Sequence, residues 1–236
     1  MVYILFAAAA CCIFSKFAGK HEALSHMAGM SSLNISPGLL LDGLRKLDRR
    51  FLYWSHGFYY IQSDSPMLSG FCIEKTKFRF RVYSFVDPLF DVVDHIQLTY
   101  SSRLLTNKSA FDEFQDRNEL LDVVLSACES SYLSVIEGLQ LSAFVKRLEN
   151  FPKRPIPGHI HWALVLALAF EARLEDAKVE LLELSKNERF MRRQYAHGSV
   201  EKLSHALQLG QEQVNLLIQR FIQERRTLLF GEKVGF

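Results

Sequence analysis

The chain has 236 residues, of which 49% are hydrophobic and 23% are charged, and its formal net charge is +2 at pH 7. This length and composition are those of a globular protein with one large or two small domains, which excludes a disordered chain. A net charge so close to zero creates no global field that would draw the protein to nucleic acid or an anionic membrane, so binding of either kind needs a local basic patch.

The first residues, MVYILFAAAACCIF, are almost wholly apolar. A membrane-spanning helix needs about 20 such residues, and a signal peptide has a basic segment before its apolar run, so we expect neither. Residues 1–35 are interpreted as a buried segment, or as a region before a true start at Met27 or Met30. Ala8-Ala9-Ala10-Cys11 resembles a bacterial lipoprotein processing site, which makes a membrane anchor at Cys11 the alternative to a cytoplasmic protein.

The first regular element is predicted to be an amphipathic helix from Ser36 to about Trp54. Ser36 is a favourable N-cap, and Pro37 suits the first helical position. Apolar residues then recur at steps of three and four, as on one face of a helix: Leu40, Leu44, Leu47, Phe51 and Trp54. We expect His56-Gly57 to end this helix, because glycine readily adopts the left-handed conformation of a C-cap.

Residues 58–101 are rich in aromatic and β-branched side chains, which predicts strands. Four antiparallel strands are expected, at 58–61, about 69–73, about 78–86 and 96–100. A turn or bulge near Glu74–Lys77 must separate the second and third strands, because their apolar residues have opposite parity. Asp87-Pro88 is expected to stop the third strand. We expect a helix to cover one face of this meander.

The chain is predicted to be helical from Ala110 onward. Leu120 to Cys128 forms one apolar stripe, a break follows at 129–131, and Ser142 is expected to cap a short helix. Further helices are expected at about 159–171, 174–186, 187–196, 199–209 and 211–229. In the last of them the predicted inward residues are Val214, Leu217, Ile218, Phe221 and Leu228. Its predicted solvent-facing residues are Gln211, Glu212, Arg220, Glu224 and Arg225.

These elements predict an α+β protein, in which an N-terminal helix and a small antiparallel sheet of about four strands precede a mostly helical C-terminal half. The loop 151–158 (FPKRPIPG) contains three prolines and a glycine, which makes it stiff and suitable as a boundary. The chain is therefore divided into 1–35, an α+β region at 36–150 and a helical region at 151–236. The last two regions remain open to forming one domain.

Small and apolar residues recur through residues 161–185 at the spacing of a close helical hairpin. They include Ala172, Leu174, Ala177, Leu181 and Leu184. This segment resembles a single tetratricopeptide-type helix pair, whose known role is to bind other proteins. No second copy follows at the repeat length of that family. The resemblance implies a protein-binding surface.

Candidate catalytic and metal-binding groups do not form a known signature. His159 and His161 begin a helix, where side chains two residues apart point in different directions, so we expect surface or interface histidines. The acidic turn Asp87, Asp91 and Asp94 lacks the glycine and terminal glutamate of a calcium loop and is expected to be solvated. Cys72 and Cys128 have apolar neighbours, as core cysteines do. The sequence contains no phosphate-binding glycine loop, and we expect no cofactor and no metal.

The most prominent polar feature is the segment Lys77, Arg79 and Arg81, whose cations share one strand face. They could bind an acidic protein or nucleic-acid phosphates, or guard a strand edge against aggregation. The leading hypothesis is a non-enzymatic protein that binds another protein, of immunity, antitoxin or adaptor type. The alternatives are an unfamiliar enzyme that uses His56, His95 or the Asp87–Asp94 turn, and nucleic-acid binding through the Lys77–Arg81 strand face. Arg189, Arg192 and Arg193 are interpreted as a solvated helix face.

Overall fold

The structure is a computed structural model that describes residues 35–75, 80–91, 96, 98–107, 117–151, 156–192 and 194–231. All of them belong to one unit, Asn34–Phe236. The interpretations of the apolar N-terminus and of Cys11 lie outside the described residues.

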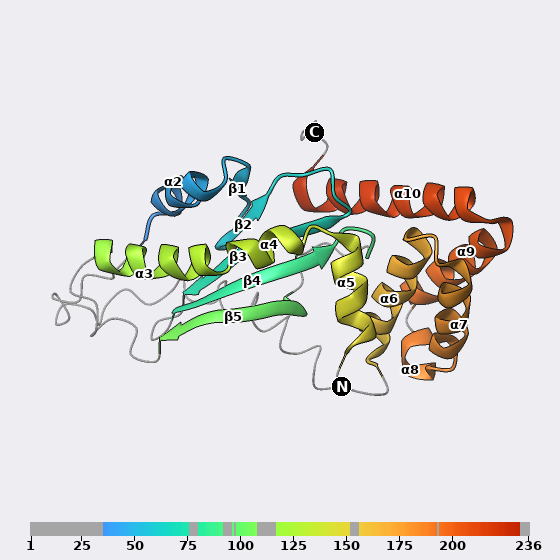
Figure 1. Cartoon of the computed structure of the whole chain (residues 1–236). Coiled ribbons are helices and arrows are strands. Elements are labelled where there is room, and N and C mark those ends of the chain that lie inside the picture. The colour runs from blue at the N-terminus through green and yellow to red at the C-terminus, as the bar shows by residue number, and fades with distance from the viewer. Residues whose placement is uncertain are drawn as a thin grey trace, which may run out of the picture. The chain divides into compact units, whose positions relative to one another are not determined.

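The described chain is an α+β protein, as the sequence predicts, with the sheet in its first part and helices in its second (Figure 1). The strands form one antiparallel sheet in the order β1 (Phe51–Tyr53), β2 (Phe58–Ile61), β3 (Met67–Lys75), β4 (Phe80–Pro88) and β5 (Tyr100–Asn107). The helices around the sheet are α2 (Pro37–Leu47), α3 (Arg117–Ser130), α4 (Tyr132–Glu137) and α5 (Leu141–Glu149). The helical half contains α6 (Gly158–Phe170), α7 (Leu174–Ser185), α8 (Glu188–Met191), α9 (Gln194–Leu209) and α10 (Gln211–Phe230).

The first helix is shorter than predicted. Helix α2 begins after Ser36 with Pro37 in its first turn, as expected, but it ends at Leu47 because Asp48 is extended. The predicted helical residues Phe51 to Trp54 instead enter the sheet: β1 covers Phe51–Tyr53, and the Trp54 amide donates to the Phe58 carbonyl.

The left-handed Gly57 lies in a β-hairpin rather than at a helix end. The Phe58 amide donates to the Ser55 carbonyl at 2.9 Å, which closes a tight turn. Its two central residues have positive φ, 48° at His56 and 83° at Gly57, as in a type I′ turn. A side chain at Gly57 would also meet the Ile73 carbonyl oxygen of β3, so glycine is required here.

The hairpin of β3 and β4 is confirmed, with Phe71 opposite Ser84 and Ile73 opposite Val82, and β4 ends at Pro88. The predicted turn between them lies largely outside the described residues. The fourth predicted strand is misplaced, because the paired segment begins at Tyr100 and continues to Asn107. Ile96 is buried without belonging to a strand.

Helices cover both faces of the sheet, not one. On the first face, Val86 and Ser69 lie against Gly138 after α4, and the Tyr59 hydroxyl donates to the Pro37 carbonyl of α2. Figure 1 shows α3 and α4 lying along this face. On the second face, Tyr60 of β2 stacks on Phe230 of α10 with ring centroids 5.2 Å apart. The sheet is therefore sandwiched, which explains why residues of both parities are buried in β3.

The helical half agrees with the predicted pattern at α6, α7 and α10. Helices α6 and α7 pack closely, and the small residues between helices are fully buried: Ala163, Ala167, Ala169 and Ala177. Helix α8 is shorter than the predicted 187–196 segment, and α9 begins at Gln194 and runs through Gly198, so the predicted break between the 187–196 and 199–209 helices is wrong. Gly210, with φ 102°, separates α9 from α10 as predicted.

One hydrophobic cluster connects the sheet with the helical half. It joins Tyr60, Cys72 and Phe85 of the sheet to Trp162 of α6 and Phe221 of α10. The Trp54 indole Nε1 also donates to the Leu229 carbonyl at 2.9 Å, which attaches the end of α10 to the first hairpin.

Candidate binding site

The basic strand face is only partly described. Lys77 and Arg79 lie outside the described residues, and Arg81 lies on β4 opposite Glu74 of β3. The Arg81 guanidinium and the Glu74 carboxylate are 3.6 Å apart, and their side chains are 32% and 39% exposed. Val82 beside Arg81 is fully buried, so the predicted alternation holds at this position.

The histidines do not converge on a catalytic centre in the described structure. His56 is exposed in the first hairpin turn and contacts the Ser55 hydroxyl, whereas His95 lies outside the described residues. His161 lies in the first turn of α6, as predicted, and its Nε2 is 2.6 Å from a carboxylate oxygen of Glu180 on α7. This contact joins two helices. Within the described ranges, no three His, Cys, Asp or Glu side chains gather as metal ligands would.

The acidic turn is buried, so the prediction that it is solvated is wrong for the described residues. Asp87 is fully buried and Asp91 is 7% exposed, while Asp94 lies outside the described residues. The buried partner of Asp87 is Arg225 of α10, with Nη2 2.6 Å from Oδ2, and Arg225 also donates to the Pro88 carbonyl. Arg225 was predicted to face water. It is fully buried because it follows Phe221 by four residues on the apolar stripe of α10.

Leu228 was predicted to face inward and is instead 51% exposed, whereas Leu229 is buried. The stripe of α10 that meets the sheet passes through Arg225 and Leu229, and Leu228 lies beside it. The inward positions Val214, Ile218 and Phe221 are confirmed.

The two described cysteines are core residues, as predicted. Cys72 and Cys128 are free thiols that are 1% and 0% exposed. Burial raises the pKa of each thiol to about 12, so neither forms a thiolate at neutral pH. A nucleophilic role for either thiol is therefore disfavoured.

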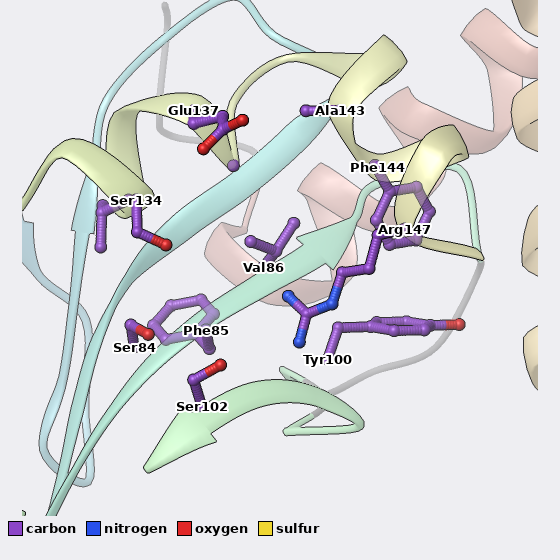
Figure 2. A pocket seen from close by; sticks show the side chains of 12 residues that line it. Ser84, Phe85, Val86, Tyr100, Ser102, Ser134, Glu137, Ala143, Phe144 and Arg147 are labelled. Atoms are coloured by element: carbon purple, nitrogen blue, oxygen red, sulfur yellow. The ribbon is translucent and has the colours of Figure 1, made fainter. Parts of the chain in front are cut away.

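An open hollow of about 220 Å³ lies where β4, β5, α4 and α5 meet. It is on the sheet face that carries α3 and α4, and Figure 2 shows its lining side chains. The lining residues are Ser84, Phe85, Val86, Tyr100, Ser102, Ser134, Val135, Glu137, Gly138, Ala143, Phe144 and Arg147. The elements that form its walls are far apart in sequence, so only the fold assembles it.

Opposite charges occupy opposite walls of the hollow. Arg147 extends from the last turn of α5, and Figure 2 shows its guanidinium directed toward β4 and β5, away from Glu137 on α4. Neither side chain forms an ion pair with another described residue. The hydroxyl-bearing Ser84 and Ser102 are cross-strand partners, so their side chains share the face below the guanidinium.

The floor of the hollow is aromatic. The Tyr100 and Phe144 rings meet edge to face at 4.9 Å between centroids, and Tyr100 is 3% exposed. Burial, together with the nearby carboxylates of Asp91 and Asp87, holds the pKa of Tyr100 well above its ordinary value. The phenol is therefore neutral at physiological pH and cannot serve as a base there. The two rings form a packed apolar floor of the hollow that Arg147 also lines.

The sequence interpretation did not identify the residues of this site. A signal existed for Ser84, which lies between Val82 and Val86 at the two-residue spacing of a buried strand face and is itself 8% exposed. A small polar residue at an otherwise apolar position of this kind is the exception that marks a site. Arg147 carried no such signal, because an arginine in the last turn of a helix is also explained by the helix dipole.

The comparisons with known proteins assign no family. No protein-family model matches the chain, and no curated protein and no solved structure matches it. In the described part of the chain, moreover, no helix has both the length and the apolar character needed to cross a membrane. The candidate site therefore depends on the geometry of the hollow alone.

Proposed function

We propose that the protein is a non-enzymatic binding protein of adaptor type, and that the hollow accepts an acidic side chain of a partner protein. The observation that carries the proposal is the Arg147 guanidinium, which has no carboxylate partner among the described residues and lies above the hydroxyl-bearing Ser84 and Ser102. A guanidinium donates two parallel hydrogen bonds to a carboxylate, and serine hydroxyls can donate to the same oxygens.

The size of the hollow favours a single side chain over a small-molecule ligand. Its volume of about 220 Å³ is below the ~300–1,000 Å³ of pockets that enclose drug-sized ligands or cofactors. A carboxylate side chain needs little of that space, and the rest of its partner would lie outside the hollow. An interface of this type places its energy in a few charged or aromatic anchors, for which arginine is favoured.

An exposed apolar residue beside the hollow supports a protein as the ligand. Leu133 of α4 is 80% exposed, and it precedes the lining residue Glu137 by four residues on the same helix face. An exposed leucine on α4, together with an arginine on the opposite wall of the hollow, matches the mixed character of protein interfaces. The tetratricopeptide-like pair of α6 and α7 is consistent with this class of function.

A charge reversal at the hollow tests the proposal. The tagged protein, its Arg147→Glu variant and a matched Arg192→Glu variant would be used to capture partners from extracts of cells that express it. Arg192 is a good control because its side chain is exposed and forms an ion pair with the exposed Glu188 at 2.9 Å. We expect stoichiometric partners of the wild type to persist with Arg192→Glu and to be lost with Arg147→Glu. Equal retention by both variants would contradict the role of the hollow.

The same proposal places the protein in a reducing, cytoplasmic compartment. Cys72 and Cys128 are free and buried on different elements, and they carry no structural disulfide. This usage is typical of intracellular proteins. Mass spectrometry of the intact protein purified under air, with both thiols found reduced, would support this assignment.

A further inference from the structure

The opposite face of β4 and β5 carries a second cluster of polar side chains. Because side chains alternate along a strand, Ser84 and Ser102 point to the hollow whereas their neighbours Tyr83 and Arg103 point to the other face. Tyr83 and Arg103 are cross-strand partners, and Arg81 lies two residues from Tyr83 on the same face. The register shifts between Val82 and Tyr83, which indicates a β-bulge at this position.

Tyr83 and Arg103 form an ordered stack. The Arg103 guanidinium carbon lies 5.8 Å from the centre of the Tyr83 ring, over the ring face. Tyr83 is half-buried and packs against the hydrophobic cluster, so its ring provides a fixed support, whereas Arg103 is exposed. A cation–π contact of this type keeps the guanidinium over the ring, and because Arg103 is exposed, the other side of the guanidinium is accessible to a second planar group.

Arg81 adds a positive charge whose local neutralisation is incomplete. Its contact with Glu74 is long, at 3.6 Å, and both side chains are about one-third exposed. The Arg81 Nε is buried and has no hydrogen-bond acceptor within the part of the chain that the structure describes. Because the Arg81 side chain is 32% exposed, an anion that approaches this face of the sheet would meet the accessible part of its guanidinium.

We propose that this face, formed by Arg81, Tyr83 and Arg103, binds a segment of single-stranded nucleic acid. A base stacks on the outer face of the Arg103 guanidinium, and a neighbouring phosphate accepts hydrogen bonds from Arg81. The planar stack decides between the two classes of anionic partner. The acidic side chains of a peptide could use the charges, whereas each nucleotide supplies both a phosphate for Arg81 and a planar base for the guanidinium that Tyr83 supports.

Fluorescence anisotropy with a labelled oligothymidylate of about 12 nucleotides tests the proposal, since single-strand sites span ~4–16 nucleotides. Loss of one stacked base corresponds to a change in affinity of about five-fold or more. We expect Arg103→Ala to weaken binding by at least that factor, and Tyr83→Leu to do the same by removing the support. Tyr83→Phe keeps the ring and should bind as the wild type does, which separates loss of stacking from loss of folding.

Salt dependence and matched controls complete the test. Each phosphate contact on a single strand contributes roughly 0.7 to the slope of log affinity against log salt. Arg81→Ala, which removes the one phosphate contact of the proposal, should therefore lower that slope by about 0.7. Arg189→Ala, which removes an exposed charge from α8, should weaken binding much less than Arg103→Ala does. The proposal is overturned if the wild type shows no saturable binding at low salt, if Arg189→Ala weakens binding as much as Arg103→Ala, or if polyglutamate competes as well as unlabelled oligothymidylate.

Discussion

The buried ion pair of Asp87 and Arg225 yields the sharpest prediction about stability. Both side chains are 0% exposed, and the Arg225 Nη2 and Asp87 Oδ2 atoms are 2.6 Å apart. Arg225→Met keeps the apolar part of the side chain but leaves the Asp87 carboxylate buried without its guanidinium. Removal of one partner of such a pair costs about 3–5 kcal/mol. Because a domain is stabilised by only ~5–15 kcal/mol in total, this single change should remove a large part of the free energy of unfolding.

Urea unfolding followed by tryptophan fluorescence measures this loss. Trp54 is a suitable reporter, because its Nε1 donates to the Leu229 carbonyl one turn beyond Arg225 on α10. With a slope near 3 kcal/mol per molar urea, the midpoint should fall by roughly 1 to 2 M. Arg192→Met, which breaks only the exposed pair with Glu188, is the matched control and should leave the midpoint unchanged.

A double-variant cycle tests the reason for the loss. Asp87→Asn combined with Arg225→Met removes both charges, so its destabilisation should be smaller than the sum of the two single changes. A midpoint of Arg225→Met within about 0.3 M of the Arg192→Met control would refute the reasoning, because it would mean that the carboxylate is not buried against Arg225.

Three further predictions concern individual residues. Burial raises the pKa of Cys72 and Cys128 to about 12, so at pH 8 the thiolate fraction is on the order of 10⁻⁴. Peptide mass spectrometry should therefore find both thiols unmodified by iodoacetamide in the folded protein and alkylated in urea. Rapid alkylation without urea would argue against their burial. Hydrogen bonding from the Arg50 side chain lowers the pKa of Asp48 from 3.8 to about 2, so this contact stabilises the fold above about pH 4 and its contribution disappears as the pH falls toward 2. The urea midpoint of Asp48→Asn should therefore approach that of the wild type as the pH falls toward 2. A difference between the two midpoints that stays constant over this pH range would contradict the stabilising role of the contact. Ala172 has φ 63°, a conformation that costs an L-residue about 1–2 kcal/mol. Ala172→Gly should raise the free energy of unfolding by about 0.5–1 kcal/mol, which is less than that cost because glycine has more freedom in the unfolded chain. A lower melting temperature of Ala172→Gly in calorimetry would contradict the expected strain.

The first hairpin shows why the sequence predicted the type of fold but not every element. The spacing of Phe51 and Trp54 continues the helical period of α2, so local periodicity favoured a helix. The turn at His56 and Gly57 lets β1 fold back on β2, and this pairing buries Phe51 against Phe71 with ring centroids 5.7 Å apart. Tertiary contact therefore overrides the local period, as it commonly does over short segments.

Arg225 and Asp87 show the opposite type of error. The spacing of the apolar residues of α10 placed Arg225 on the buried stripe, but its charge led to the prediction of a solvated side chain. A buried arginine is acceptable only where a buried acceptor lies opposite, and Asp87 is 138 residues away in sequence. A single sequence cannot show that these two exceptions are partners.

The residues of the hollow, and of the face formed by Arg81, Tyr83 and Arg103, could not be predicted for a similar reason. Their residues come from β4, β5, α4 and α5, and a strand register with a bulge decides which side chains share a face. The sequence predicted β4 well and Arg81 within it. It placed the next strand too early, so Ser102 and Arg103 could not be recognised as neighbours of Ser84 and Tyr83.

Site-specific photo-crosslinking tests the central claim most directly, that the protein binds a partner at the hollow beneath Arg147. A photoreactive amino acid would replace Leu133 beside the hollow, and in a second protein Leu182 on α7, which is also exposed at 63%. We predict that Leu133 yields a discrete crosslinked partner whose attached peptide contains an aspartate or glutamate, and that Arg147→Glu abolishes it. Crosslinks from Leu182 alone, or crosslinks from Leu133 that survive Arg147→Glu, would contradict the account.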